Sequence, residues 1–389
     1  MQLLFRVLFG VCCLVSSAFA SPSISLRFLT ISDIHYGSKN NSMDGQNVGD
    51  NFLAVSMSKF QELSKNVDFV ITLGDLPTHL MGISLDKELY EKTVFHDLFE
   101  SNSQKKPMFY ISGNNDSLGG NYQPFDYQGK TPLNFANDWT GACVYCEGLI
   151  IDDSHMQSHG YYSTYVVPNN KDVMLIVLNA TQWTITPKYA AKYPNQDEDA
   201  KEQLSWLKDQ LHNNSAKQLL IAIHEPPGKA YNGALIWKNN YLQEFVKLLD
   251  QNQTAYGQIT LLSSHTHMDE IRKIGLSNHK NVYDYATPAV SRVHMNNSGM
   301  KIFELDDKMT IANYITYYTT SITQWNNDSY QALNAAKSIF ARCLNKNLEQ
   351  CLDSLTDDQV CLAMEAGRYY GVKSNRVNNR QCRVVYKVN

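Results

Sequence analysis

Five short polar segments of this 389-residue chain carry side chains of the kinds that bind divalent metal ions. They supply carboxylate, amide and imidazole groups, and each follows a run of apolar and β-branched residues that predicts a β-strand. Loops that follow strands are where α/β folds place their chemistry. Together these groups suit two borderline divalent ions that share one carboxylate. The segments are Asp33–His35, Gly74–Asp75, Gly113–Asp116, His224–Glu225 and His265–His267.

Strands and helices that would position these segments alternate along the first half of the chain. Helical spacing of apolar residues predicts helices at 48–65 and 85–101. Alternation of strand, helix and strand is typical of a parallel sheet that helices cover on both faces. The strands are predicted at 27–32, 67–73 and 107–112.

The second half has a similar pattern after a loop-rich stretch at 114–161. A helix is predicted at 197–212, and two strands that close the sheets in antiparallel fashion are expected at 282–286 and 300–305. The fold class is therefore expected to be α/β, a two-sheet αββα sandwich with the metals between the sheets. The other strands of this half are predicted at 173–179, 218–223 and 259–264.

The first 20 residues have the features of a secretory signal peptide. Arg6 is their only charge, 7–15 is almost entirely apolar, and Ala18–Ala20 fits a small-x-small cleavage site. A membrane helix needs about 20 apolar residues, and the polar pair Ser16–Ser17 interrupts this segment earlier. We therefore expect a secreted, extracellular protein that begins near Ser21 and has no stable association with membranes.

The net charge of −4 indicates no broad basic surface. Such a surface is the usual electrostatic footprint of a protein that binds nucleic acid or an anionic membrane. A nucleic-acid polymer is therefore not an expected partner.

Six cysteines remain after the predicted cleavage, an even number that favours disulfides in an exported chain. Cys143 and Cys146 form a C-x-x-C pair, for which a small disulfide loop is favoured over a zinc site with His155 and His159. Composition changes after about Ser321 to short helical stretches without strand signal, which predicts a cysteine-rich helical subdomain at 321–389. Its cysteines are Cys343, Cys351, Cys361 and Cys382.

The order of the motifs, Asp-x-His, Gly-Asp, Gly-Asn-x-Asp, His and His-x-His, resembles that of the calcineurin-like metallophosphoesterases over residues 27–305. The resemblance implies a metallophosphoesterase domain at 21–320 with two divalent ions, of which zinc is the first choice. On the family pattern Asp75 bridges the two ions. The first ion would be held by Asp33, His35, Asp75 and His267, and the second by Asp75, Asn114, His224 and His265.

The resemblance also implies a reaction. A hydroxide that bridges the ions would attack phosphorus, because coordination lowers the pKa of water towards neutrality. Both ions would neutralise the phosphoryl oxygens. The expected protein is thus a metal-dependent phosphoric diester hydrolase, a monomer that acts on a small-molecule phosphate ester or nucleotide.

One position departs from the family pattern. The variable residue of Gly-Asn-x-Asp is usually a histidine that protonates the leaving oxygen, whereas here it is Asn115, which cannot titrate and is expected to contact the substrate. Loss of a general acid typically lowers the rate by about 10²–10⁴-fold. His79, four residues after Asp75, is the expected substitute as acid or substrate contact, the alternative being an exposed loop histidine. Asp116 is expected to orient the ligands through hydrogen bonds.

Further segments narrow the resemblance to the acid sphingomyelinase-like phosphodiesterases, which are secreted or lysosomal zinc enzymes. They are Gly74–His79, Ala286–Val290, the strand at 300–305 and the cysteine-rich tail. The first predicted strand starts too soon after Ser21 for a saposin-type domain, which favours the type that acts on soluble nucleotides and nucleotide-choline compounds. The sequential family pattern implies the disulfides Cys343–Cys351 and Cys361–Cys382.

Two alternative functions stay open, a sphingomyelin phosphodiesterase and a metal-binding pseudoenzyme impaired by Asn115. Retention of all seven predicted ligands favours an active enzyme. Aromatic residues of the long loop would either stack on a base or pack within the loop. They are Tyr122, Phe125, Tyr127 and Trp139.

Overall fold

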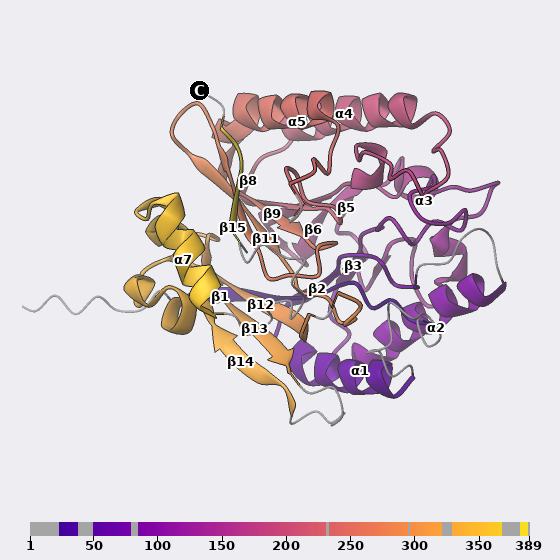
Figure 1. Cartoon of the computed structure of the whole chain (residues 1–389), viewed down its shortest axis with the longest axis horizontal. Coiled ribbons are helices and arrows are strands. Elements are labelled where there is room, and N and C mark those ends of the chain that lie inside the picture. The colour runs from indigo at the N-terminus through magenta and orange to yellow at the C-terminus, as the bar shows by residue number, and fades with distance from the viewer. Residues whose placement is uncertain are drawn as a thin grey trace, which may run out of the picture.

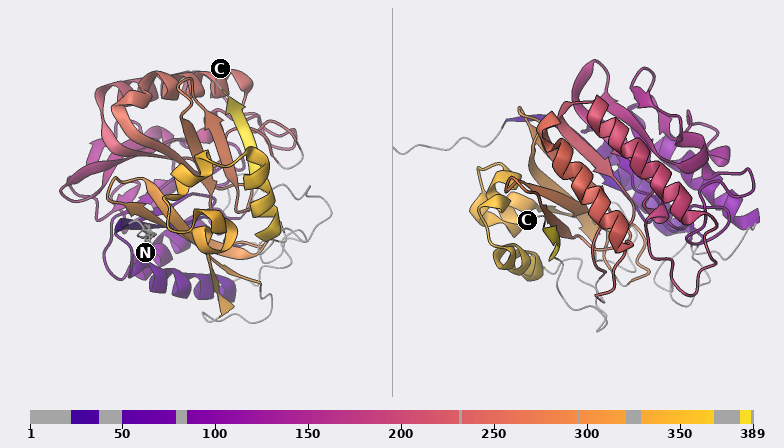
Figure 2. Two further views of the ribbon diagram at one scale, coloured as in Figure 1. Left: turned by 90° about the vertical axis from the view of Figure 1, so that its left-hand side faces the viewer. Right: turned by 90° about the horizontal axis from the view of Figure 1, so that it is seen from above.

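The computed structural model describes residues 23–37, 50–78, 85–230, 233–294, 296–320, 329–367 and 382–387. Within these residues two mixed β-sheets pack face to face, with helices on their outer faces (Figure 1). The α/β sandwich predicted from the sequence is thereby confirmed. One sheet is covered by α1 (Asp50–Ser64) and α2 (Leu85–Ser101), and the other by α4 (Gln196–Asn213) and α5 (Asn239–Asn252), which lie side by side (Figure 2).

The seven-stranded sheet has the order β14-β13-β12-β1-β2-β3-β4. Its strands β1 (Ile24–Ile31), β2 (Phe69–Thr72) and β3 (Met108–Tyr110) are parallel, so their carboxyl ends meet at one edge. β12 (Ser298–Asp306) runs antiparallel to β1, as predicted for 300–305. The other strands are β4 (Cys143–Val144), β13 (Ile311–Thr319) and β14 (Gln331–Asn334).

The eight-stranded sheet has the order β15-β10-β11-β9-β8-β7-β6-β5. β7 (Asn170–Val177), β8 (Ala216–Ala222) and β9 (Tyr256–Ser263) are parallel. β11 (Asn281–Ala286) pairs antiparallel with β10, as expected for 282–286, and parallel with its other neighbour, β9. The other strands are β5 (Ile150–Asp152), β6 (Tyr162–Val167), β10 (Ile271–Gly275) and β15 (Cys382–Lys387).

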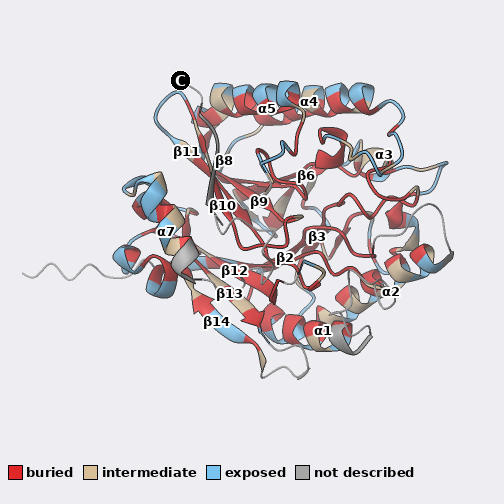
Figure 3. Cartoon of the chain, in the orientation of Figure 1, coloured by how far each residue is buried: buried red, intermediate tan, exposed pale blue. Residues whose placement is uncertain are grey.

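Burial on both sides explains why the central strands are continuous apolar runs. All four residues of β2 are buried, and Figure 3 shows the same for most of the central strands. In the core of the seven-stranded sheet, Phe28 stacks between Phe69 and Phe303, with ring centroids 4.9 and 4.8 Å away. On the other side, α5 buries Leu242, Phe245 and Leu249, which share one face at helical spacing.

Short helices complete the described chain. They are α3 (Met156–His159), α6 (Leu348–Asp353), α7 (Asp357–Gly367), the 3₁₀ turns Pro132–Phe135, Ala180–Gln182, Gln253–Ala255 and Ala341–Cys343, and the π-helical turn Ala335–Ile339. No described helix combines the length and apolar character that a bilayer-spanning segment requires.

The tail contains strands as well as helices, which differs from the prediction of a wholly helical segment. β14 and β15 extend the edges of the two sheets. β14 has only four residues, two of them exposed, so its pattern is too short to separate strand from loop. The division into 21–320 and 321–389 stays a prediction, and the predicted signal peptide lies outside the described residues.

Two of the three predicted disulfides are present. Cys143 is bonded to Cys146, which excludes a zinc site at these sulfurs, and Cys343 is bonded to Cys351. The third predicted bridge, Cys361–Cys382, involves the side chain of Cys382, which lies outside the described part of the chain.

Glu349 of α6 is buried against the eight-stranded sheet. Thr260 of β9 donates a 2.9 Å hydrogen bond to its Oε1, whereas Oε2 has no hydrogen-bond partner. Burial raises the pKa of Glu349 to about 8. The folded chain therefore favours the protonated form of this carboxyl group.

We predict that Glu349→Gln makes the free energy of unfolding less dependent on pH. The pKa of Glu349 is raised on folding, so the folded chain binds more protons between about pH 4.3, the unfolded value, and the folded value. Its contribution therefore lowers stability as pH rises through that window. Denaturant unfolding near pH 5 and near pH 8 measures this effect. Between these pH values the free energy of unfolding of the variant should rise relative to that of the wild type by a few kcal/mol. Parallel pH profiles for both proteins would contradict this assignment.

Candidate metal centre

Two groups of carboxylate and imidazole side chains lie where the carboxyl ends of strands from both sheets meet. In each group the candidate ligand atoms lie within 4.8 Å of one another. All six residues are among the seven ligands predicted from the sequence, and the structure brings them together. The first cluster consists of Asp33, His35 and His267, and the second cluster of Asp75, His224 and His265.

The loops that carry these residues have an unusual backbone. Five of the six residues are in the left-handed region, with φ of 49° at Asp33, 50° at His35, 53° at Asp75, 66° at His265 and 64° at His267. Positive φ is uncommon for residues other than glycine, and such strain concentrates at functional sites. The turns therefore direct side chains into the junction at a conformational cost that the surrounding structure offsets.

Two glycines allow these loops to approach closely. A Cβ on Gly74, which has a φ of 85°, would meet the backbone N of Gly113 and lie 2.8 Å from the carbonyl oxygen of Ile111. A Cβ on Gly113 would meet Oδ1 of Asp75 and lie 2.9 Å from Cγ of His224. Both glycines of the sequence motifs are thus required by close packing around Asp75.

The first cluster has the geometry of groups that share a cation. Nε2 of His35 lies 3.2 Å from Nε2 of His267, and Oδ1 of Asp33 lies 3.3 Å from the same His267 nitrogen. Oδ1 of Asp33 is buried and has no hydrogen-bond partner. Two imidazole nitrogens and an anionic oxygen that converge in this way fit a divalent ion.

In the second cluster, His224 is fixed in the tautomer that a ligand needs. Its Nδ1 donates a 2.6 Å hydrogen bond to the carbonyl oxygen of Leu73, to which the hydroxyl of Ser264 also donates at 3.2 Å. In the neutral imidazole Nε2 of His224 therefore carries the lone pair, and it lies 3.2 Å from Oδ2 of Asp75. Such backbone partners typically orient metal-binding histidines.

Asp75 lies between the two clusters. Its Oδ2 is 3.2 Å from Nε2 of His224 in the second cluster and 3.7 Å from Nε2 of His35 in the first. Only a carboxylate offers anionic oxygens to two neighbouring cations. This position fits the predicted bridge.

Asn114 and Asn115 have different environments. Nδ2 of Asn114 donates to Oδ1 of Asn121 at 2.6 Å, while its own Oδ1 is buried without a hydrogen-bond partner and is thus available to an ion. Asn115 donates from its backbone N to Oδ1 of Asp75 at 2.8 Å and from Nδ2 to Oδ2 at 2.6 Å. Its side chain therefore orients Asp75 and offers no titrating group.

Asp116 joins the two loops that surround Asp75. Its Oδ2 accepts hydrogen bonds from the backbone N of Asp75 at 2.9 Å and of Gly113 at 2.6 Å. Its Oδ1 accepts from the backbone N of Leu76 at 2.8 Å. Burial and the charge of Asp75 raise the pKa of Asp116 to about 6. These bonds perform the orienting role expected of this residue.

Four of the cluster residues favour the protonation states that ion binding requires. Burial would raise the pKa of Asp33, but His267 and His224 hold it well below its usual range. Burial opposes ionisation of Asp75 as well, yet His224 and His35 lower its pKa. Burial lowers the pKa of His265 and of His267 to about 3. Ionised carboxylates and neutral imidazoles are the forms that bind metals.

Burial opposes protonation of His224, but the charges of Asp75 and Asp33 raise its pKa well above the usual range. A proton on this imidazole would partly neutralise the negative charge of these buried carboxylates. A divalent cation between the clusters would neutralise the same charge.

The other five side chains singled out in the sequence have different outcomes. His79 lies outside the described residues, so its role stays a prediction. Phe125 and Trp139 are buried in the core, and Nε1 of Trp139 donates to the carbonyl oxygen of Phe95 at 3.1 Å, so these two rings pack within the protein. Tyr127 is half-buried. Tyr122 points its hydroxyl at Nε2 of His265, 3.4 Å away.

His294 is a neighbour of the site that sequence reasoning missed. Its ring meets that of His267 edge-on, with centroids 4.4 Å apart, and it is exposed at the edge of the first cluster. It follows no strand and belongs to none of the five motifs, so the sequence carries no signal for it.

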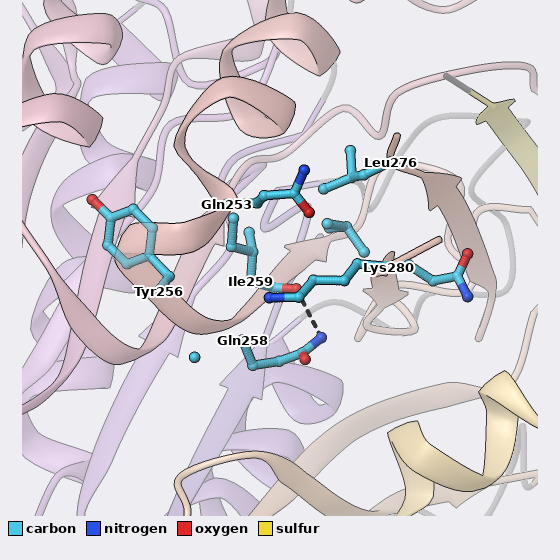
Figure 4. Close-up of a pocket in the computed structure, with 9 residues that line it drawn as sticks. Gln253, Tyr256, Gln258, Ile259, Leu276 and Lys280 are labelled. Atoms are coloured by element: carbon cyan, nitrogen blue, oxygen red, sulfur yellow. Dashed lines mark hydrogen bonds between the residues drawn. The ribbon is translucent and has the colours of Figure 1, made fainter. Parts of the chain in front are cut away.

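A separate pocket lies at the opposite end of β9 from the clusters (Figure 4). It is lined by Gln253, Tyr256, Gln258, Leu276 and Lys280 among others, and its volume is only about 10 Å³. That space holds about one water molecule. This pocket is therefore too small to hold a substrate.

A family model described as calcineurin-like phosphoesterase matches residues 26–269. No curated protein matches the sequence.

Several solved structures are similar to the chain at low identity. A dimetal phosphatase from Danio rerio has 12% identity and a TM-score of 0.47, over 80% of this chain and 99% of that one. A 5'-nucleotidase from Candida albicans has 12% identity and a TM-score of 0.44, over 90% and 59%. An NAD nucleotidase from Haemophilus influenzae has 13% identity and a TM-score of 0.37, over 85% and 56%. The chain thus spans less than two thirds of both nucleotidases.

We predict that Asp75→Asn weakens ion binding at both clusters, because it removes the anionic oxygen that lies beside both His35 and His224. Titration with Zn²⁺ should show that ion affinity falls at least about 10–100-fold at each cluster. Loss of a residue that only hydrogen-bonds to a metal ligand already has an effect of this size. Asp284→Asn is the matched control, since Asp284 is also a fully buried carboxylate but lies outside the clusters. Full, tight occupancy of two ions in Asp75→Asn would remove the bridging assignment.

Proposed function

This chain belongs to the calcineurin-like phosphoesterase family, and we propose that it is a secreted zinc phosphodiesterase that hydrolyses soluble nucleotides or nucleotide-choline compounds. At the coarser level it is a phosphoester hydrolase of a family that uses two divalent metals, with two candidate clusters for them. The observation that carries the proposal is the convergence of both clusters on the carboxylate of Asp75.

The two clusters define what the chain's own residues would do. Bound there, two divalent ions supply Lewis-acid stabilisation of phosphoryl oxygens and an activated nucleophile at neutral pH. The mixed imidazole and carboxylate set suits zinc better than the all-oxygen sets of calcium or magnesium. The first cluster would hold one ion, and the second cluster with Asn114 would hold the other, with Asp75 available to both. Asn115 and Asp116 keep Asp75 oriented through the hydrogen bonds described above.

The preference for nucleotide-type substrates follows from Asn115. Its side-chain amide is hydrogen-bonded to Asp75 and is not acidic enough to protonate a leaving group. A phosphate or nucleotide leaving group has a last pKa near 6 and departs largely unprotonated. An alkoxide such as the ceramide oxygen is far more basic and relies on an acid in the transition state. Cleavage of phosphoanhydrides is therefore less impaired than cleavage of alkyl esters.

We predict activity on ATP or CDP-choline. The kcat/KM for sphingomyelin should be lower than for these substrates by roughly 10²-fold or more, because the usual acid is missing. Asn115→His should raise the rate of cleavage of alkyl diesters. It should leave the rate for bis(p-nitrophenyl) phosphate, whose leaving group needs no proton, nearly unchanged.

His79→Ala should selectively lower alkyl-ester cleavage if His79 is the substitute acid. Equal losses of both substrate types would mean that His79 only positions phosphate. Sphingomyelin turnover equal to that of ATP would overturn the leaving-group argument.

The competing function is a metal-binding pseudoenzyme. The specific observation in its favour is that Asn115 replaces the acid and occupies Oδ2 of Asp75. A chain that binds two ions tightly but turns over neither ATP, CDP-choline nor bis(p-nitrophenyl) phosphate would establish that alternative.

Secretion is part of the proposal. The disulfides Cys143–Cys146 and Cys343–Cys351 are of the kind that persists in oxidising compartments. We predict that the full chain expressed in a secreting host is exported and that amino-terminal sequencing finds Ser21 as the first residue. A chain retained inside the cell with Met1 intact would contradict this prediction.

A further inference from the structure

A buried ion pair joins the loop of His267 to the opposite sheet. Oδ1 of Asp269 lies 2.8 Å from Nζ of Lys301, and neither residue is exposed at all. Asp269 stands two residues after His267, just before β10 of the eight-stranded sheet. Lys301 belongs to β12 of the seven-stranded sheet, so the pair crosses the interface between the sheets.

Both charges of the pair are fully engaged. Nζ of Lys301 also donates to the carbonyl oxygen of Ala286 at 2.7 Å and lies 4.4 Å from the ring centroid of Tyr314. Oδ2 of Asp269 accepts a 2.7 Å hydrogen bond from the hydroxyl of Thr316 on β13. The carboxylate is thus held in a single place by two neighbouring strands of the other sheet.

Stability alone does not account for such a pair. Removing two charges from water costs several kcal/mol for each ion, and well-packed neutral replacements of buried ion pairs are often as stable or more so. What a buried pair adds is a fixed geometry. The relevant geometry here is that of the first cluster, because its members come from both sheets.

Lys301 is also close to the other half of that cluster. It pairs in register with Thr30 of β1, three residues before Asp33. The pair therefore links the strand that leads to Asp33 and His35 with the loop that carries His267. Across the same junction, Oδ1 of Asp33 lies 3.3 Å from Nε2 of His267. The second cluster has a cross-sheet link of its own, from His224 to the carbonyl oxygen of Leu73.

We propose that Lys301 and Asp269 are positioning residues that place His267 against Asp33 and His35 and thereby set the ion affinity of the first cluster. The proposal rests on the metal centre of the proposed function. The proposal predicts different effects at the two ion positions. Loss of the pair should lower ion affinity at the first cluster and leave ion affinity at the second cluster unchanged.

The test compares Lys301→Met with the double variant Lys301→Met/Asp269→Asn. Unfolding of the metal-free proteins measures stability, and titration with Co²⁺, followed by visible absorption, measures affinity at each position. A His35→Ala protein identifies the binding step of the second cluster. Lys301→Met alone leaves a buried unpaired carboxylate and should lower stability as well as first-cluster affinity.

The double variant is expected to recover most of the stability. Its ion affinity should still be about 10–100-fold lower than that of the wild type at the first cluster, with little change at the second. Lys301→Arg, which keeps the charge, should restore part of that affinity. Arg272→Met is the matched control. Arg272 is a buried cation paired with Glu270 within the eight-stranded sheet, 2.6 Å away, so its loss should lower stability and spare the first cluster.

A double variant that binds both ions as tightly as the wild type, or that loses both equally, would overturn the positioning role. A wild-type chain that binds no Co²⁺ would overturn the proposed function and this inference together, so the two failures are distinguishable.

Discussion

The burial of two carboxylates, Asp33 and Asp75, between the sheets is the constraint around which the rest of the site is arranged. Both are almost completely withdrawn from solvent. An ionised carboxylate in such a place requires nearby positive charge or hydrogen-bond donors. The histidines of both clusters and the amide of Asn115 supply these partners, and a pair of divalent cations would supply more. The same demand explains why every loop at this junction carries donors or ligands.

The local backbone serves this arrangement. Left-handed turns at five cluster residues direct their side chains inward, and Gly74 and Gly113 let neighbouring loops approach within contact of Asp75. Hydrogen bonds to the carboxylate of Asp116 and to the carbonyl oxygen of Leu73 then hold the turns and one imidazole in place. Strain in the loops is thus offset by bonds that also fix the chemistry of the site.

The parts predicted from the sequence are those with local signals. Strands β1, β2, β3, β8 and β9 are buried apolar runs that end in polar motifs, and α2 has the predicted bounds of 85–101. Parts that depend on distant partners were missed. β14 and β15 are edge strands whose pairing decides their conformation, and α5 was not predicted although its apolar residues have helical spacing. The pairing of Asp269 with Lys301 comes from sheet packing and has no signature in either segment.

The most direct test of the central claim is anomalous diffraction from crystals grown with Zn²⁺, measured on both sides of the zinc absorption edge. We expect two zinc peaks about 3.5–4 Å apart, the usual spacing of two-metal sites. One peak should lie among Asp33, His35 and His267 and the other among His224, His265 and Asn114, with Asp75 touching both. A single peak, or zinc held by other residues while these six histidine and carboxylate side chains stay hydrogen-bonded to one another, would contradict it.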